Sequence, residues 1–202
     1  MTLYPLMVNL RGRPAVVVGG GPVGRRRAAG LVAAGARVRV IDPADVEPVA
    51  GAVHVREPYT AGHLAGAALV AACTDDRKVN AQIGLDARAA GAWVNIADDP
   101  ADGDFTVPAI HRTEGLTVAV ATTWGLPTLA ATLRDRCAAA LGNDVDAFAA
   151  ALSRLRERLK AEAPPEVRRD LLVRLCGDEG LAAFRAGGEA ALADLADRAL
   201  DG

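Results

Sequence analysis

Short apolar runs alternate with amphipathic segments through the first half of the chain. The apolar runs predict strands over residues 15–18, 37–41, 53–55, 67–73 and 92–96. The run Ala67–Cys73 is continuously apolar, which is typical of a strand buried on both faces of a sheet. Helical spacing follows the first run, in an alanine-rich stretch up to Ala36, and the fourth, over Lys78–Ala90. This order predicts a parallel sheet with right-handed crossovers.

The pattern changes after Pro100. Residues 105–110 and 116–120 alternate between apolar and polar positions, with Glu114-Gly115 between them, which predicts a β-hairpin. Pro127 then opens a helix that runs to Leu141. An isolated two-stranded hairpin is only marginally stable in water. We therefore expect a second copy of the chain to cover it.

Helical spacing dominates the residues from Asp144 onward. Apolar side chains recur every three or four positions, and Ala163-Pro164-Pro165 interrupts the pattern. We interpret these apolar stripes as the core of a helical end rather than as a cofactor site.

A glycine turn, Gly19-Gly20-Gly21-Pro22-Val23-Gly24, joins the first predicted strand to the first helix. Gly19, Gly21 and Gly24 have the spacing of the dinucleotide-binding fingerprint. The first glycine permits the tight turn, the second lets a pyrophosphate approach the backbone, and the third lets helix and strand pack closely. The N–H groups at the helix N-terminus favour a phosphate.

Asp42 ends the second predicted strand, about twenty residues beyond the glycine turn, where such folds place a ribose-binding carboxylate. An acidic residue there favours NAD over NADP, because it repels a 2′-phosphate. The alternative is an exposed glycine turn without a ligand, with Asp42 as a strand-end cap. Ligands of parallel sheets bind beyond the carboxyl ends of the strands. That rule places the glycine turn, Asp42, Thr74-Asp75-Asp76 and Asp98-Asp99 along one rim.

Thr74-Asp75-Asp76 has two interpretations that are compatible. Its backbone at the end of the fourth strand would approach the ribose of a cofactor, and its side chains also suit the N-terminal cap of the following helix. The carboxylates of Asp99, Asp102 and Asp104 are expected to solvate their loop.

The overall composition narrows the function classes. The 202 residues are 51% hydrophobic and 24% charged, with a formal net charge of −2. This balance gives no electrostatic case for nucleic acid or an anionic membrane, and solvent exposure is expected to account for Arg25-Arg26-Arg27. No apolar run has membrane-spanning length and no signal peptide is evident, so we expect a cytoplasmic protein. Cys73, Cys137 and Cys176 suggest neither disulfides nor a metal site, and are expected to be small buried hydrophobes.

Several motifs occur in a specific order along residues 1–141. They are Tyr4-Pro5-Leu6, Val18-Gly19-Gly20-Gly21-Pro22-Val23, Thr74-Asp75-Asp76, Val94-Asn95-Ile96-Ala97-Asp98-Asp99-Pro100, Phe105-Thr106-Val107-Pro108-Ala109 and Leu116-Thr117-Val118-Ala119-Val120. This ordered set resembles the precorrin-2 dehydrogenase/sirohydrochlorin ferrochelatase family. That family is the dehydrogenase–chelatase module of siroheme synthase, and the chain shows it without the fused methyltransferase.

The resemblance implies oxidation of precorrin-2 to sirohydrochlorin by NAD, and in bifunctional members insertion of Fe²⁺ to give siroheme. It implies a homodimer interlocked through the hairpin region. It also implies that Pro22, Val23, Pro43 and Ala44 contact NAD and that Asp98 is catalytic. A carboxylate beside the nicotinamide can accept the proton that dehydrogenation releases. From residue chemistry alone, Asp98 could equally cap the turn before Pro100.

Together these observations predict an α/β protein with three parts. A Rossmann-like NAD-binding domain is expected over residues 1–112, a hairpin–helix dimerisation region over residues 113–143, and a small helical domain over residues 144–202.

The loop Ala121–Pro127 departs from the family pattern, which has a serine- and glycine-rich loop ending in Ser-Pro. Trp124 and Leu126 replace small residues there, which puts the chelatase step in doubt. Two alternative functions remain: a sirohydrochlorin metal chelatase without redox activity, and a non-catalytic module that binds NAD or a tetrapyrrole. His54, His63 and His111 are isolated, and only His111 is expected near the tetrapyrrole cleft.

Overall fold

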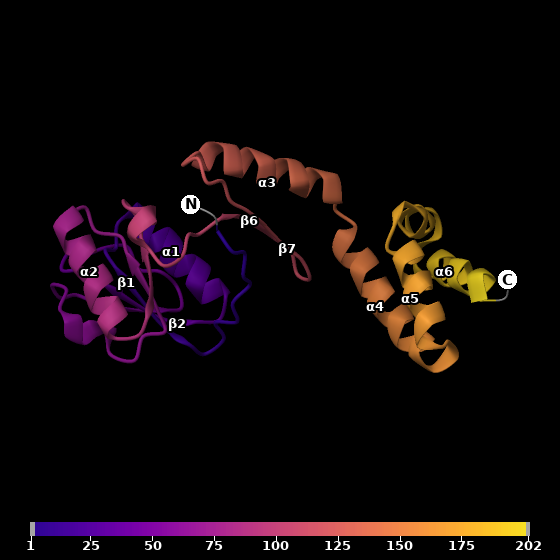
Figure 1. Ribbon diagram of the computed structural model, residues 1–202, viewed down its shortest axis with the longest axis horizontal. Helices are drawn as coiled ribbons and strands as arrows, with labels where there is room; N and C mark the ends of the chain where they lie inside the picture. The colour runs from indigo at the N-terminus through magenta and orange to yellow at the C-terminus, as the bar shows by residue number, and fades with distance from the viewer. Residues whose placement is uncertain (1–2, 201–202) are drawn as a thin grey trace. The chain divides into compact units, whose positions relative to one another are not determined.

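The structure, a computed structural model, describes residues 3–200 (Figure 1). The chain divides into two units, with the boundary between Val107 and Pro108. The first unit holds the parallel sheet and its helices. The second holds a hairpin and four helices.

The first unit is built on a five-stranded sheet. Its strands are β1 (Pro14–Val18), β2 (Arg37–Ile41), β3 (Ala52–Val55), β4 (Leu69–Ala72) and β5 (Trp93–Ile96). They lie in the order β3-β2-β1-β4-β5, and every neighbouring pair is parallel. The predicted Rossmann-like parallel sheet is confirmed, and β4 is buried along its whole length as its unbroken apolar run indicated.

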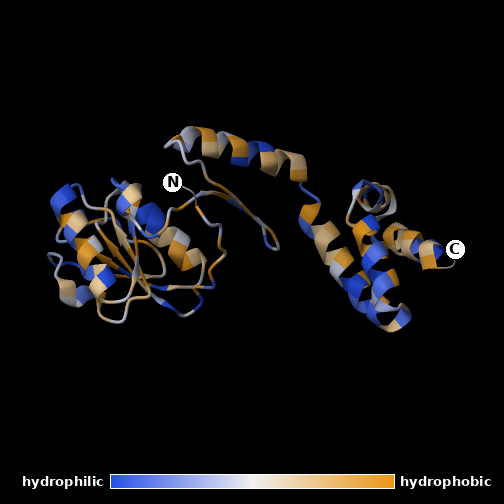
Figure 2. Cartoon of the chain, in the orientation of Figure 1, coloured by the Kyte–Doolittle hydropathy of each residue, from blue (hydrophilic) through white to orange (hydrophobic). Residues whose placement is uncertain are grey.

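Helices cover both faces of this sheet because successive strand residues point to opposite sides. Val16 and Val18 of β1 join a buried cluster with residues of α2 (Arg77–Ala89), whereas Ala15 and Val17 join a cluster with residues of α1 (Pro22–Ala33). Figure 2 shows the hydrophobic colour concentrated on these central strands. Two short 3₁₀ turns, Ala61–Leu64 and Pro100–Asp102, complete the unit.

The strand order reverses direction between β1 and β4. The chain leaves β1 toward β2 on one side and later returns to place β4 on the other side. The loops at the carboxyl ends of these two strands therefore diverge, and such a point in an open α/β sheet is where ligands bind.

The second unit begins with an antiparallel hairpin of β6 (Ala109–Arg112) and β7 (Thr117–Val120), against which α3 (Pro127–Leu141) packs. The hairpin forms as predicted, but its first strand spans Ala109–Arg112, so the predicted strand bounds of 105–110 were wrong. The carbonyl oxygen of Phe105 accepts a hydrogen bond from Asn95 Nδ2 at 3.0 Å, within the first unit. Pro108 lacks a backbone donor, so strand pairing starts only after it.

The helical end follows the predicted pattern. It consists of α4 (Val145–Glu162), α5 (Pro165–Leu175) and α6 (Asp178–Leu200), and α6 is kinked at Gly187 and Gly188. The apolar stripes meet in one core. Its largest buried members are Phe148, Leu155, Leu159, Leu171, Leu175, Leu192 and Leu195.

Two further expectations are tested by burial. Cys73 is buried as expected, but Cys137 and Cys176 are exposed, because α3 and the end of α5 turn these positions to solvent. Within the described part of the chain, no helix combines the length and apolar character needed to cross a membrane.

Candidate dinucleotide site

The glycine turn follows β1 directly, and two of its glycines are required by close packing. Gly19 has φ +99°, and a Cβ there would lie 2.5 Å from the carbonyl oxygen of Cys73. A Cβ on Gly24 would overlap the carbonyl oxygen of Gly19. The turn therefore packs closely against the tip of β4 on one side and against the first turn of α1 on the other. These are the tight-turn and close-packing roles of the fingerprint.

Gly21 differs from its neighbours because its surroundings are open. No atom lies within 4 Å of the position that a Cβ on Gly21 would occupy. Gly21 is also the N-cap residue of α1 and offers no side-chain cap, and Pro22 and the exposed Val23 follow it. The backbone at the positive end of the helix is therefore accessible, which fits a pyrophosphate group.

Asp42 lies immediately after β2 and contacts the glycine turn. Its Oδ2 accepts a hydrogen bond from the backbone N–H of Gly20 at 2.6 Å, and its Oδ1 accepts one from Ala44 at 2.8 Å. A carboxylate has about four acceptor positions. Asp42 therefore retains acceptor capacity for hydroxyl groups while it holds the turn. The neighbouring Pro43 and Ala44 are exposed.

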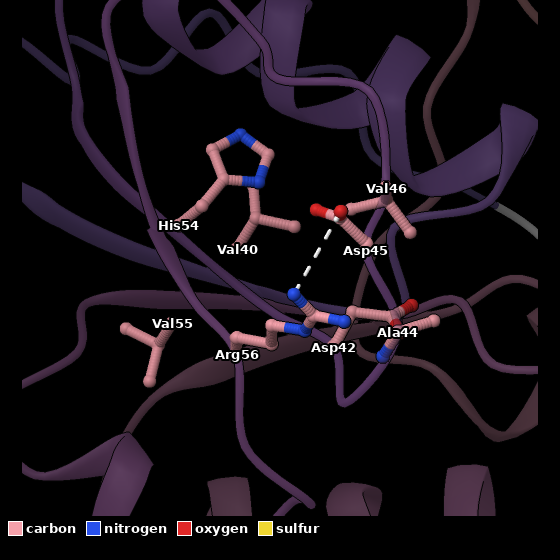
Figure 3. A pocket seen from close by; sticks show the side chains of 8 residues that line it. All are labelled: Val40, Asp42, Ala44, Asp45, Val46, His54, Val55 and Arg56. Atoms are coloured by element: carbon pink, nitrogen blue, oxygen red, sulfur yellow. Dashed lines mark hydrogen bonds and ion pairs between the residues drawn. The ribbon is translucent and has the colours of Figure 1, made fainter.

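A small hollow of about 50 Å³ opens beside Asp42 and Ala44, at the carboxyl ends of β2 and β3 (Figure 3). Arg56 and Asp45 form an ion pair of 3.7 Å across it. His54 also lines the hollow, and its Nε2 accepts a hydrogen bond from the backbone of Val49 at 2.9 Å. The ring of His54 is therefore already engaged in a hydrogen bond within the protein.

At the tip of β4, Thr74 is held by an amide from α2. The backbone N–H of Thr74 donates to Asn80 Oδ1 at 3.1 Å, and its carbonyl oxygen accepts from Asn80 Nδ2 at 3.0 Å. The capping interpretation of this motif is confirmed for Asp76, whose Oδ1 accepts from the N–H of Lys78 at 2.8 Å. Asp75 is exposed.

Asn80 also reaches the predicted catalytic residue. Its Nδ2 donates to Asp98 Oδ1 at 2.8 Å, and the side chain of Asn80 is only 1% exposed. Sequence reasoning missed Asn80. A signal was available, because Asn80 is three residues before Ile83, on the same buried stripe of α2. A polar amide on an apolar stripe indicates a buried hydrogen-bond network.

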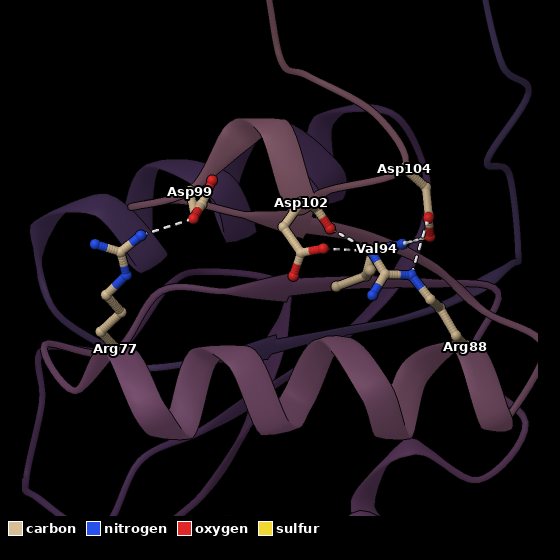
Figure 4. A network of polar contacts seen from close by, with 6 residues as sticks. All are labelled: Arg77, Arg88, Val94, Asp99, Asp102 and Asp104. Atoms are coloured by element: carbon tan, nitrogen blue, oxygen red, sulfur yellow. Dashed lines mark hydrogen bonds and ion pairs between the residues drawn. The ribbon is translucent and has the colours of Figure 1, made fainter.

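The loop that carries Asp98 is fastened to α2 and β5 on both sides (Figure 4). Arg77 donates to Asp99 at 2.8 Å, and Asp104 accepts from the backbone N–H of Val94 at 2.9 Å. Arg88 pairs with Asp104 at 3.3 Å and also contacts Asp102. Besides solvating their loop as expected, these aspartates pair with two arginines of α2.

Arg27 is a second residue whose surroundings differ from expectation. Arg25 pairs with Glu47 and Arg26 is exposed, but Arg27 is half-buried, and its Nε makes no hydrogen bond to the residues that the structure describes. Burial lowers the pKa of Arg27. Solvent exposure therefore does not explain the whole triplet.

The charge of Arg27 also affects the pKa of the Cys73 thiol. Burial raises the pKa of the Cys73 thiol to about 11; Arg27 lowers that pKa and Asp98 raises it further. The cation and the carboxylate thus both act on the tip of β4, and the thiol stays protonated at neutral pH.

The predicted rim is therefore continuous in the first unit. Asp42 holds Gly20, Gly19 presses on Cys73 and Thr74, and Asn80 joins Thr74 to Asp98. His111 is on β6 in the second unit. Among residues 3–200, no three His, Cys, Asp or Glu side chains gather as a metal site would require.

Comparisons with known proteins agree with this geometry. Residues 6–109 match the NAD_binding_7 family, described as "Putative NAD(P)-binding". Siroheme synthase 2 of Aeromonas hydrophila is 37% identical over 165 residues, covering 79% of this chain and 35% of that protein. Siroheme synthase 1 of Aeromonas salmonicida is 37% identical over 205 residues, covering 98% of this chain and 44% of that protein. The chain thus spans less than half the length of these relatives.

A solved structure, SirC, a precorrin-2 dehydrogenase, has the same fold. It superposes with a TM-score of 0.74 and 20% identity, over 97% of this chain and all of that chain. The predicted resemblance to siroheme synthase and to precorrin-2 dehydrogenase is confirmed by these matches. The family model covers half of the chain, including the glycine turn, Asp42 and Asp98. The chain therefore belongs to the NAD_binding_7 family of NAD(P)-binding proteins.

Proposed function

We propose that this chain is an NAD-dependent dehydrogenase that oxidises precorrin-2 to sirohydrochlorin in siroheme biosynthesis, in the cytoplasm. The observation that carries the proposal is the line of contacts from Asp42 through the glycine turn to Asp98. This line of contacts supports the proposal because the glycine turn, Asp42 and Asp98 lie on one rim of one sheet. The siroheme synthase relatives supply the substrate class.

The residues of the cradle have distinct roles in this proposal. Gly19 and Gly24 keep the turn tight, and Gly21, Pro22 and Val23 leave the helix N-terminus open to the pyrophosphate. On the adenosine side, Asp42 accepts hydrogen bonds from the ribose hydroxyls and disfavours a 2′-phosphate. Pro43 and Ala44 line that side.

Residues at the tip of β4 would hold the other end of the dinucleotide. Thr74 and Asp75 border the second ribose there. When bound, NAD⁺ accepts the hydride that leaves the substrate.

Asp98 receives the proton that is lost with this hydride. It is exposed, and among residues 3–200 its Oδ2 has no hydrogen-bond partner, so this oxygen can approach a C–H or N–H group of the substrate. The sum of the two steps is one hydride transferred to NAD⁺ and one proton transferred to the Asp98 carboxylate. Solvent then removes that proton.

Anaerobic incubation with precorrin-2 and NAD⁺ tests the proposal. The sirohydrochlorin spectrum should appear, and Asp98→Asn should lower kcat by about 10²–10⁴-fold, the range that general-base catalysis contributes. Asp102→Asn, which changes an exposed carboxylate of the same loop, is the matched control and should remain active. Absence of turnover by folded, NAD-binding protein would favour a non-catalytic module instead.

Metal insertion is a separable second activity. The loop 121–127 departs from the family pattern, and Trp124 within it is 79% exposed. We propose Fe²⁺ as an optional second substrate because the family resemblance implies it, and the changed loop is the reason that this step needs a test of its own. Incubation of sirohydrochlorin with Fe²⁺ and without NAD⁺ distinguishes a chelatase, which yields siroheme, from a dehydrogenase alone.

We also propose that the chain forms a homodimer through the hairpin and α3. Among the described residues of α3, only Ala130 is buried, and Ile110, Leu126 and Leu129 are exposed by 38%, 50% and 39%. Apolar side chains gathered on a marginal hairpin favour cover by a second copy. Light scattering should give twice the chain mass, and Leu129→Arg should shift it toward the monomer.

A further inference from the structure

The side chain of Asn80 makes four hydrogen bonds at the tips of two neighbouring strands. Its Oδ1 accepts from the backbone N–H and from the hydroxyl of Thr74, at 3.1 and 2.8 Å. Its Nδ2 donates to the Thr74 carbonyl oxygen at 3.0 Å and to Asp98 Oδ1 at 2.8 Å. Every donor of this amide is therefore engaged, and one of the two binds the carboxylate of Asp98.

Helix formation alone does not require an asparagine at this position. Asp76 already caps α2, and the backbone N–H of Asn80 bonds to the Asp76 carbonyl oxygen at 3.0 Å in ordinary helical fashion. The position belongs to the buried stripe with Ile83 and Ala87. An apolar side chain there would avoid the cost of burying an amide. The amide is needed instead because it joins the loop after β4, at Thr74, to the loop after β5, at Asp98.

We propose that Asn80 is a positioning residue that decides which oxygen of Asp98 takes the substrate proton. This inference rests on the proposed function. An amide N–H donates and cannot accept, so it engages Oδ1 and leaves Oδ2 as the oxygen of Asp98 without a hydrogen-bond partner among residues 3–200. The proton removed from the substrate is therefore received by Oδ2. The three bonds to Thr74 fix the amide against the tip of β4, so Oδ2 keeps one orientation relative to the glycine turn.

Asn80→Asp is the sharpest test because it preserves size and removes the donor. At pH 8 the introduced carboxylate repels Asp98, and kcat should fall about 10–100-fold while the KM for NAD⁺ changes less than about twofold. Lowering the pH protonates one carboxyl of the new pair, which restores a donor to Asp98. The kcat of the variant relative to wild type should therefore rise as the pH is lowered toward 6.

Asn95→Asp is the matched control. Asn95, on β5, is a second buried amide of the same unit, 3% exposed, and it donates to Phe105 rather than to Asp98. It should lower the melting temperature without this pH-dependent recovery of kcat. Asn80→Ser, whose hydroxyl can still donate, should retain more activity than Asn80→Ala.

The outcomes separate the two proposals. If Asp98→Asn is inactive but Asn80→Asp keeps the kcat of wild type at every pH, the positioning role is wrong and the dehydrogenase stands. If Asn80→Asp loses activity without recovery at low pH, and loses NAD⁺ binding in fluorescence titrations as well, Asn80 is merely structural. If Asp98→Asn remains fully active, the proposed base itself is wrong.

Discussion

The Oδ2 atom of Asp42 lies 2.6 Å from the backbone nitrogen of Gly20 and accepts its hydrogen bond. The residue proposed to recognise the cofactor ribose therefore also holds in place the turn proposed to bind the pyrophosphate. Gly20 is further confined by Val46, because a Cβ on Gly20 would lie 2.6 Å from the side chain of Val46. The ribose and pyrophosphate ends of the site are thus mechanically coupled before any ligand arrives.

We expect Asp42→Ala to weaken NAD⁺ binding and to destabilise the fold together. Loss of a charge-assisted hydrogen bond to Gly20 should lower the free energy of unfolding by about 1–3 kcal/mol. Denaturant unfolding and NAD⁺ titration measure the two effects. Asp42→Asn keeps one of the two acceptor oxygens, so it should recover only part of the stability, and it should narrow the preference for NAD⁺ over NADP⁺. Equal NAD⁺ affinity in all three proteins would exclude a ribose contact.

Substitutions at Gly24 and at Gly21 are expected to have different effects, one on stability and one on NAD⁺ binding. A Cβ on Gly24 overlaps the Gly19 carbonyl oxygen, so Gly24→Ala should lower the unfolding free energy by about 1–3 kcal/mol or more through overpacking. A Cβ on Gly21 meets no atom within 4 Å, so Gly21→Ala should melt like wild type but bind NAD⁺ more weakly. Gly30→Ala, also open in α1, is the control and should be neutral or stabilising. A Gly21→Ala variant with unchanged affinity would argue against a pyrophosphate there.

The three cysteines should differ in reactivity. Burial raises the pKa of Cys73 to about 11, whereas Cys176 is exposed. A thiol reagent at pH 8 should therefore modify Cys176 in the native protein and reach Cys73 only after unfolding. Cys137 on α3 reports on the dimer, since a partner that covers α3 would slow its reaction. Rapid native labelling of Cys73 would show that the tip of β4 opens.

Acid stability should depend on Asp146, at the start of α4. The hydroxyl of Thr113 donates to Asp146 Oδ1 at 2.6 Å, and this bond, with those from Gly115 and Glu114, lowers the pKa of Asp146. A lowered pKa stabilises the fold above the unfolded value of 3.8, and that contribution disappears as the pH falls through the folded value.

We therefore expect Asp146→Asn to melt below wild type at pH 7, and the difference to shrink as the pH falls from about 5 to 3. Thermal melts followed by circular dichroism across that range measure it. A difference that is constant with pH would mean that the hairpin turn does not depend on the charge of Asp146.

Local sequence patterns predicted most of the fold because the residues that specify each helix or strand are close together in the chain. The unbroken run Ala67–Cys73 contains the fully buried β4, and α3 runs from Pro127 to Leu141 as predicted. The strand predicted over residues 105–110 was misplaced because a distant side chain, Asn95, takes the carbonyl oxygen of Phe105. Long-range hydrogen bonds of this kind produce no periodic pattern of apolar and polar residues in the local sequence.

The sequence by itself determined the alternation of strands and helices, the glycine turn and the acidic residues at the strand ends. Periodicity and backbone sterics act over a few residues, so they can be read along the chain. Only the tertiary structure decided that Asn80 joins Thr74 to Asp98, that Arg27 is half-buried, and that Arg77 and Arg88 pair with the loop after β5. The contacts of Asn80 form because parallel strands bring their carboxyl ends to one edge, and that placement is a property of the folded sheet.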